Sequence, residues 1–263
     1  MEGAIGVGYA IADELLRRNV ATVIITGTDE QQGQKAASRL SRQHCPGMVR
    51  FHKMHPGNSS AYENAFKYIK ENFSTVDIFI NNARNVLPTF TLDVDDVINT
   101  HLMHQIQGII LARNHMQSGS VIINHTSALG LGNTVVQPTM IMHCAASSGL
   151  IATSRAFSDK IYYDKNRIRI ITLCSDLLPP VHSVRIGDSI YCKLPENESS
   201  SNNIVEAIAK STAYLVERGP SGTVWLCERD WTLNMLSIRS LAKQIYDEEN
   251  KEPEAETSER LII

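Results

Sequence analysis

The sequence lacks the features that mark membrane, secreted and nucleic-acid-binding proteins. None of its apolar runs reaches eighteen residues, so no membrane-spanning helix is expected. Its first residues carry no basic stretch of the secretory type, and its five cysteines are odd in number and form no Cys-x-x-Cys pair. The net charge of −3 provides no basic field for phosphates. We therefore expect a cytoplasmic protein with free thiols and with no nucleic-acid, membrane or metal partner.

What the chain does have is the composition of one globular domain. Its 263 residues are 43% hydrophobic and 20% charged, which is too apolar for a disordered chain. The length suits a single large domain, which we place at residues 1–246. Residues 247–263 are acidic and polar, and we expect them to form a disordered tail.

Short apolar runs alternate with helical stretches along this domain. The runs are rich in Val and Ile and mostly continuous, which is typical of strands covered on both faces by helices. The alternation predicts an α/β fold with a doubly wound, Rossmann-like parallel sheet. We place strands at 20–26, 48–54, 76–81, 120–124, 168–174 and 223–227, and helices at 8–18, 31–42, 61–73, 93–116, 139–159 and 202–216.

The chain opens on a glycine-rich turn, with Gly3, Gly6 and Gly8, that runs directly into a helix. Such glycines let the backbone approach a pyrophosphate and direct helix N–H groups at it. Tight packing between a strand and a helix would require the same residues. In a βαβ unit a strand precedes this turn, and here no strand-like run does.

Several motifs, in order along the chain, resemble those of the short-chain dehydrogenase/reductase family. The glycine turn is similar to that family's Gly-x-x-x-Gly-x-Gly turn, and Asn81-Asn82-Ala83 is similar to its Asn-Asn-Ala-Gly. Residues 123–130 resemble the strand and turn that carry the family's catalytic serine, and residues 170–174 resemble its sixth strand. Residues 221–225 resemble the last strand of the insect alcohol dehydrogenase and 15-hydroxyprostaglandin dehydrogenase-like branch. The resemblance implies NAD as cofactor, bound at Gly3, Gly6, Gly8, Asn81 and Ala83.

The same resemblance assigns catalytic positions, and most of them hold unsuitable residues. The family transfers a hydride while a tyrosine, with its pKa lowered by a lysine four residues later, moves a proton. Ser127 stands at the family's serine position, but Met140 stands at the tyrosine and Cys144 at the lysine. His101 stands where the family has an asparagine that organises a water. Methionine has no titratable proton, and cysteine brings no cation.

The expected cofactor positions have changed as well. NAD-preferring members end their second strand with an acidic residue that binds the adenine ribose. Here Gly27 holds that position, and Asp29, two residues later, is a partial substitute. The other changed positions are Met1-Glu2, His55-Pro56, Arg84 and Ser175-Asp176. We expect NAD binding to be weak or lost.

The family also places its first strand at the sheet centre, and this sequence has no such strand. Its absence would leave unpaired backbone between the strands at 20–26 and 76–81, which is costly when buried. Three interpretations stay open: an incomplete sequence, altered strand pairing, or a strand supplied by a partner chain.

The preferred hypothesis is a catalytically inactive member of the family that acts as a binding or oligomer-partner protein. Its partners would be a second copy, a related chain or a small apolar ligand, with helices 93–116 and 139–159 as the oligomer interface. The alternative is an NAD-dependent oxidoreductase acting on the CH–OH group of secondary alcohols. Two weaker hypotheses are a nucleophilic Cys144 and a metal bound by His101 and His104, which lie three residues apart.

Overall fold

The computed structural model describes residues 3–44, 47–55, 60–73, 75–82, 94–131, 140–175, 191–193, 204–227 and 232–235. The expected tail at 247–263 lies outside these residues, as do Ala83 and Arg84. No helix in the described part is long and apolar enough to cross a membrane. Three of the five cysteines lie in the described part with their side chains, and all three (Cys144, Cys174 and Cys227) are free thiols.

The strands form two separate sheets. Strand β1 (Val23–Gly27) pairs in parallel with β2 (Val49–Lys53) in a two-stranded sheet. The second sheet has six strands in the order β3-β4-β5-β7-β8-β6. Its bounds are β3 (Ile78–Asn81), β4 (Val121–Ser127), β5 (Arg169–Ser175), β6 (Tyr191–Lys193), β7 (Val224–Cys227) and β8 (Thr232–Met235). Strands β3, β4, β5 and β7 are mutually parallel, whereas β8 runs antiparallel to both of its neighbours.

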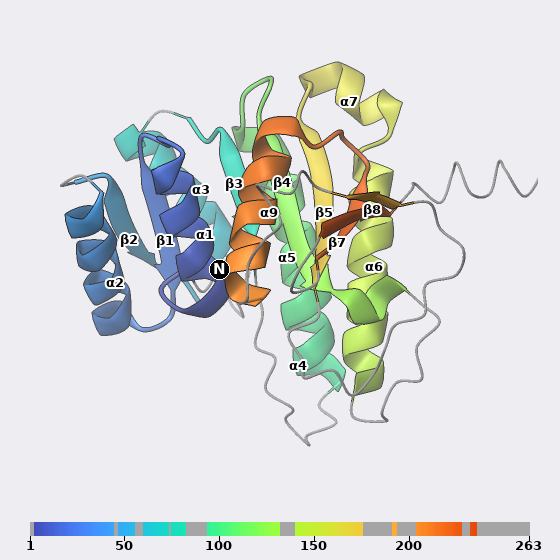
Figure 1. Ribbon diagram of the computed structural model, residues 1–263, viewed down its shortest axis with the longest axis horizontal. Helices are drawn as coiled ribbons and strands as arrows, with labels where there is room; N and C mark the ends of the chain where they lie inside the picture. Colours follow the sequence, from blue (N-terminus) through green and yellow to red (C-terminus); the bar gives the residue numbers. More distant parts are fainter. Residues whose placement is uncertain are drawn as a thin grey trace, which may run out of the picture.

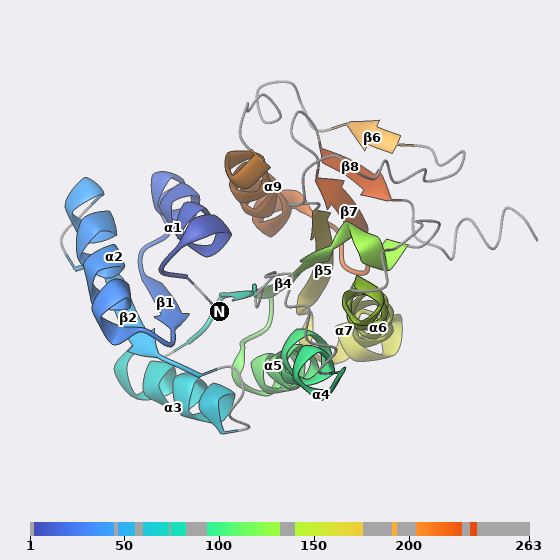
Figure 2. The same ribbon diagram turned by 90° about the horizontal axis from the view of Figure 1, so that it is seen from below.

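Helices cover the strands on both faces, as Figure 2 shows in the view from below. Three helices lie on one face: α1 (Gly6–Arg17), α2 (Glu30–Gln43) and α9 (Ile204–Arg218). The others lie on the opposite face: α3 (Ala61–Phe73), α4 (Val94–Ile98), α5 (His104–His115), α6 (Ile141–Phe157) and α7 (Lys160–Asn166). These are the three layers of a doubly wound α/β fold, which confirms the predicted fold class (Figure 1).

Alternate residues of the central strands build the core on either side of the sheet. Ile123 and Ile171 pack with Leu15 of α1 under one helical layer. Their neighbours Ile122 and Ile170 face the other layer, where they pack with Leu150 of α6 and related residues. Every residue of β4 except the last is buried, and so is every residue of β5 except the first. This two-sided burial explains why their apolar runs are continuous rather than alternating.

Three details depart from the elements expected from the sequence. The expected helix at 93–116 is interrupted by a π-helical turn, Asn99–Met103, between α4 and α5. A 3-10 turn, Ala128–Leu131, follows β4 directly. Strands β6 and β8 were not expected, and they extend the sheet beyond β7 in antiparallel pairing.

In the described part of the chain, no strand lies between β1 and β3. Strand β1 pairs with β2 on one side, and β3 pairs with β4 on one side, but β1 and β3 belong to different sheets. Figure 2 shows the two sheets side by side. β1 and β3 are therefore each paired on one side only, whereas β4 and β5 are paired on both sides and almost fully buried.

Candidate dinucleotide and catalytic site

The glycine turn lies against the carboxyl end of β1. A Cβ atom added to Gly3 would lie 2.8 Å from the Cβ atom of Ile25, so only glycine fits without a shift of the backbone. The backbone N–H of Gly3 donates a hydrogen bond to the carbonyl oxygen of Thr26 at 2.8 Å. Gly6 has φ +52° and open space around its Cβ position, so it fills a left-handed position at the start of α1. Close packing accounts for Gly3 and backbone conformation for Gly6.

The first turn of α1 has N–H groups that no capping side chain satisfies. The N-cap residue is Ile5, which has no side-chain acceptor, and the turn contains no acidic residue. Gly8 lies within this turn. Free N–H groups at a helix N-terminus favour an anion such as a phosphate. This part of the expected dinucleotide site keeps its chemistry.

The ribose side of the expected site has lost its acceptor. Gly27 is the last residue of β1 and offers no side chain, although a Cβ atom there would meet only Phe51 Cε2, at 3.5 Å. The Asp29 carboxylate accepts a hydrogen bond from the backbone N–H of Gln32 at 2.9 Å and caps α2. The carboxylate that the sequence offered as a substitute is thus engaged in helix capping.

A buried polar network joins β3, β4 and two helices beneath the site. The Asn81 side-chain amide donates to the Asn124 side-chain oxygen at 3.1 Å and to the carbonyl oxygen of Gln105 at 2.9 Å. The Asn124 amide donates in turn to the hydroxyl of Ser154 on α6 at 2.9 Å. Asn81 is only 1% exposed. Its side chain ties elements together here, and a contact with a cofactor stays a prediction.

A second buried cluster lies at the carboxyl ends of three neighbouring strands. His125 of β4 lies with its Nδ1 atom 2.6 Å from Asn82 Oδ1 and its Nε2 atom 2.7 Å from the hydroxyl oxygen of Ser175. Because an amide oxygen only accepts, Nδ1 carries the proton toward Asn82 and Nε2 accepts from Ser175. Sequence reasoning missed this role of His125. The available signal was a run of polar residues, Asn124 to Thr126, in a strand that is otherwise apolar.

The catalytic positions gather around the 3-10 turn after β4. The Ser127 hydroxyl oxygen accepts a hydrogen bond from the backbone N–H of Leu129 at 3.2 Å. The thiol of Cys144 donates to the carbonyl oxygen of the same Leu129 at 3.2 Å. Met140 is the N-cap residue of α6, one turn before Cys144, and is 9% exposed. Ser127 and Cys144 thus both hydrogen-bond to the backbone of Leu129.

Imidazole groups lie beside these positions. His101, in the π-helical turn, packs edge-to-face against His143, with ring centroids 4.9 Å apart. His143 directly precedes Cys144 in α6. Burial lowers the pKa of His104, and its Nδ1 atom has no hydrogen-bond partner among the described residues. No group of three or more metal-ligating side chains occurs in the described part, so His101 and His104 do not form part of one there.

The sequence model of the family described as short chain dehydrogenase matches residues 2–179, well over half of the chain. The chain belongs to the short-chain dehydrogenase family.

Its relatives among characterised sequences place it in the insect alcohol dehydrogenase-like branch of that family. It is 24% identical to alcohol dehydrogenase 2 of Ceratitis capitata, over 85% of this chain and 88% of that protein. It is 27% identical to the alcohol dehydrogenase-related 31 kDa protein of Drosophila lebanonensis, over 52% of this chain and 53% of that protein. The corresponding protein of Drosophila subobscura is 23% identical over 94% of this chain and 92% of its own length.

Solved structures share the fold. A doubly substituted short-chain dehydrogenase/reductase of Serratia marcescens has a TM-score of 0.67 and 19% identity, covering 87% of this chain and 94% of that chain. A short chain dehydrogenase of Burkholderia cenocepacia in complex with NADP has a TM-score of 0.62 and 20% identity, covering 84% of this chain and 89% of that chain. At these identities the likeness shows the Rossmann-like fold alone.

The site of this short-chain dehydrogenase fits a nicotinamide dinucleotide only in part. The N-terminus of α1 suits the phosphates. Gly27 provides no carboxylate for the ribose hydroxyls, and Cys144 provides no ammonium group beside Ser127. The carboxylate and the ammonium group that the family has are therefore absent at these two positions.

Proposed function

We propose that this short-chain dehydrogenase is a non-catalytic binding protein. The observation that carries the proposal is the pair Met140 and Cys144, which stand on α6 where the family has its proton-transferring tyrosine and its lysine. A thioether has no proton to transfer at any accessible pH. Loss of a general acid or base typically costs about 10²–10⁴-fold in rate. Loss of the lysine adds to that cost.

The hydrogen bonding of Cys144 supports the proposal. Its thiol proton is directed at the Leu129 carbonyl oxygen. Ser127 is retained, but its hydroxyl oxygen accepts from the Leu129 N–H. Both side chains thus stabilise the 3-10 turn. That is a structural use of positions that the family uses for catalysis.

We further propose that dinucleotide binding is weak or lost. The support is Gly27, which leaves the ribose hydroxyls without a carboxylate, and the engagement of Asp29 as the α2 cap. Hydrogen bonds to charged groups contribute about 1.5–3 kcal/mol each. Loss of that contribution alone weakens binding by about ten- to hundredfold.

The partner we propose is a second copy or a related chain, docked on helices α4 to α6. Several apolar side chains lie exposed on these helices and the π-helical turn between them: Val94, Met103, Ile110 and Ile141, at 42–52% exposure. On the same helices, Ile109, Leu150 and Ile151 are buried and belong to the core. Exposed apolar residues in one region are typical of an interface.

An enzymatic assay tests the absence of catalysis. The purified chain is incubated with NAD and a panel of secondary alcohols, and NADH is followed by its absorbance beside a Ser127→Ala variant. We expect both proteins to give only the background rate. Formation of NADH by the unaltered chain that Ser127→Ala reduces about tenfold or more would overturn the proposal in favour of an alcohol-oxidising enzyme.

Sedimentation tests the oligomer. We expect the chain to sediment as a dimer or larger species, and a Met103→Glu/Ile110→Glu variant to shift toward the monomer. The matched control is Ile161→Glu, which changes a residue that is 69% exposed on α7. A monomer at all concentrations, or equal effects of the two variants, contradicts this interface.

A further inference from the structure

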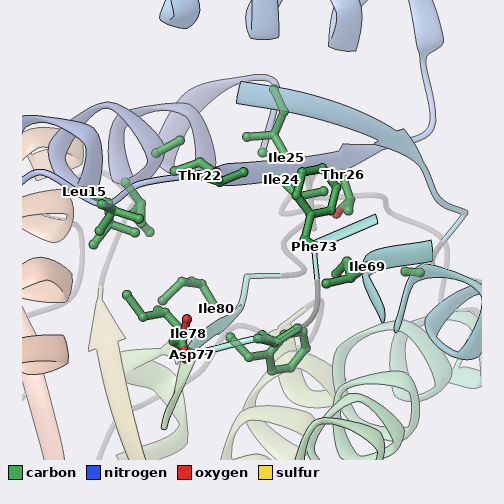
Figure 3. Close-up of a pocket in the computed structure, with 18 of the residues that line it drawn as sticks. Leu15, Thr22, Ile24, Ile25, Thr26, Ile69, Phe73, Asp77, Ile78 and Ile80 are labelled. Atoms are coloured by element: carbon green, nitrogen blue, oxygen red, sulfur yellow. The ribbon is translucent and has the colours of Figure 1, made fainter. Parts of the chain in front are cut away.

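Helix α7 carries a cluster of apolar, aromatic and basic side chains at the amino ends of the parallel strands. It precedes β5 directly, whereas Ser127 ends β4 at the opposite end of the sheet. Figure 1 shows α7 beyond one end of α6, far from α4. No residue of the cluster lines the pocket of about 410 Å³ in Figure 3, which Ile24 and Ile78 border. We call this cluster the α7 patch, and it consists of Arg113, Lys160, Ile161, Tyr162 and Lys165.

Arg113 of α5 joins α6 and α7 through two aromatic rings. Its guanidinium carbon lies 5.1 Å from the ring centroid of Phe157 and 4.8 Å from that of Tyr162. The two rings are tilted against each other, with centroids 5.9 Å apart. Cation–π contact holds the guanidinium in place. Arg113 has no hydrogen-bond or ion-pair partner in the described part of the chain, so its N–H groups are available to a carboxylate.

Apolar surface lies exposed beside this guanidinium. Ile161 is 69% exposed, more than any other large hydrophobic residue that the structure describes, and Tyr162 is 39% exposed. Tyrosine and arginine are enriched among the residues that dominate binding at interfaces. An apolar side chain next to them adds area that a bound segment can cover.

The acidic residues next to the patch are engaged within the fold. The Asp159 carboxylate caps α7 by accepting a hydrogen bond from the backbone N–H of Ile161 at 3.1 Å. The Asp164 carboxylate lies 3.8 Å from a guanidinium nitrogen of Arg167. These two carboxylates therefore do not neutralise the lysines of the patch.

The patch thus has a surplus of positive charge. Lys160 and Lys165 are exposed, and neither has an ion-pair partner among the residues that the structure describes. Arg113 adds a third cation of the same kind. This surplus occurs in a chain whose net charge is −3, so the balancing negative charge lies elsewhere in the sequence. A surface of this kind suits a segment that is acidic and partly apolar.

The chain itself contains a segment of that composition. Residues 247–263 include seven carboxylates against two cations, and they also include the apolar run Leu261-Ile262-Ile263. A segment this polar buries too little apolar surface to fold alone, and it gains order by binding to a complementary surface. Its charge and its apolar run match the two components of the patch.

The path of the chain brings this segment within reach. Met235, the last residue of β8, pairs with Val224, the first residue of β7. Because β7 runs parallel to β5, this end of β8 lies at the amino end of β5, where α7 is. Two strand spacings, about 10 Å, separate β8 from β5. Residues 236–246 can span about 35 Å when extended, and a link of this length gives an effective concentration of order millimolar.

We propose that residues 247–263 dock on the α7 patch of the same chain. Their carboxylates pair with Lys160, Lys165 and Arg113. Their apolar residues cover Ile161 and Tyr162. The docked segment shields a basic and apolar surface that is otherwise open to acidic segments of other proteins.

Chemical cross-linking of the full chain tests this contact. A carbodiimide joins a carboxylate to a lysine amine where the two are in contact, and mass spectrometry of the digest identifies the joined residues. We expect amide links from Lys160 and Lys165 to glutamates of residues 247–263. The matched control is Lys35, which is exposed on α2 in the opposite helical layer and has no ion-pair partner among the described residues. We expect at least about tenfold fewer links at Lys35.

An equal mixture of isotope-labelled and unlabelled chain shows which copy supplies the segment. We expect each link to join two peptides of the same label. Links between labelled and unlabelled peptides overturn docking within one chain. Links to Lys35 as frequent as those to Lys160 and Lys165 overturn the patch itself, and so does the absence of links to both lysines of the patch.

Proteolysis gives an independent measure in the full chain. A glutamate-specific protease cleaves the segment only while it is undocked, so the rate follows the undocked population. Lys160→Gln/Lys165→Gln removes two cations of the patch, and we expect cleavage within residues 252–259 to be at least about fivefold faster. The control Lys35→Gln/Arg42→Gln removes the same charge from exposed positions of α2 and should stay within about twofold. Equal rates for the two variants overturn the proposal, and neither readout depends on hydride transfer or cofactor binding.

Discussion

The thiol of Cys144 donates a hydrogen bond to the carbonyl oxygen of Leu129, whose N–H donates to Ser127. One residue of the 3-10 turn thus links the retained serine to the residue at the lost lysine position. The resemblance to the family assigns both positions to the catalytic site. Here they hold the turn that follows β4, which agrees with a scaffold kept for binding.

Substitutions of Cys144 measure how much its hydrogen bond to Leu129 contributes to the free energy of unfolding. Cys144→Ser preserves a donor, so we expect a free energy of unfolding within about 0.5 kcal/mol of the unaltered chain. Cys144→Ala removes the hydrogen bond and a partly buried sulfur, and we expect a loss of about 1 kcal/mol. Urea unfolding measures both values. Equal stability of the two variants would show that the hydrogen bond to Leu129 contributes nothing.

Breaking the Asn81–Asn124–Ser154 network should lower the free energy of unfolding more than the Cys144 substitutions do. Asn124→Ala removes the hydrogen bonds to both neighbours inside the core, and we expect a loss of about 2–3 kcal/mol. The matched control is Asn72→Ala, because Asn72 is exposed and bonds only within its own helix. That variant should stay within about 0.5 kcal/mol in the same urea experiment. Similar losses for the two variants would contradict a structural role of the network.

Gly27→Asp restores a carboxylate at the ribose position. A side chain fits there, because the nearest heavy atom to its Cβ would be 3.5 Å away, in the ring of Phe51. We expect about ten- to hundredfold tighter NADH binding by fluorescence titration. Gly27→Ala is the control and should leave affinity unchanged. No gain from the aspartate means that the phosphate side of the site has also lost its affinity.

Two histidines predict the direction of the pH dependence of stability. Burial lowers the pKa of His52 and of His104 below the usual 6.5. As the pH falls below about 6.5, the unfolded chain therefore binds protons that the folded chain does not. The stability that the two neutral imidazoles contribute is present above about pH 6.5 and is lost as the pH falls below it. We expect the slope of the urea midpoint between about pH 6.5 and 5 to be smaller in a His52→Gln/His104→Gln variant. An unchanged slope would contradict the assignment.

Much of the fold could be predicted from local sequence patterns. The apolar runs at 120–124 and 168–174 have the continuous pattern of helix-covered strands, and they form β4 and β5 with a two-sided core. Strands β6 and β8 were not predicted, because their pairing at the sheet edge depends on tertiary contacts that leave little local signal.

The sequence predicted those features of the site that depend on residue type, and not those that depend on contacts in the folded chain. The residue types of Met140 and Cys144 alone predict a loss of proton-transfer chemistry. The roles of Asp29 and His125 depend on what lies beside them in space. Asp29 caps α2, which the capping preference of aspartate before a helix indicates. His125 bridges residues 43 and 50 positions away, and no sequence pattern gives such a contact.

An NADH titration followed by thermal unfolding tests most directly the account's central claim, that the dehydrogenase scaffold persists without its cofactor-dependent chemistry. A ligand at about one hundred times its Kd stabilises the folded state by about 2.7 kcal/mol. For a domain of this size that is a shift of about 5–10 °C in Tm. The account predicts a single cooperative transition whose Tm moves by less than about 2 °C at about 1 mM NADH. A shift above about 5 °C would contradict it, because it would show an intact dinucleotide site with Kd near about 10 μM.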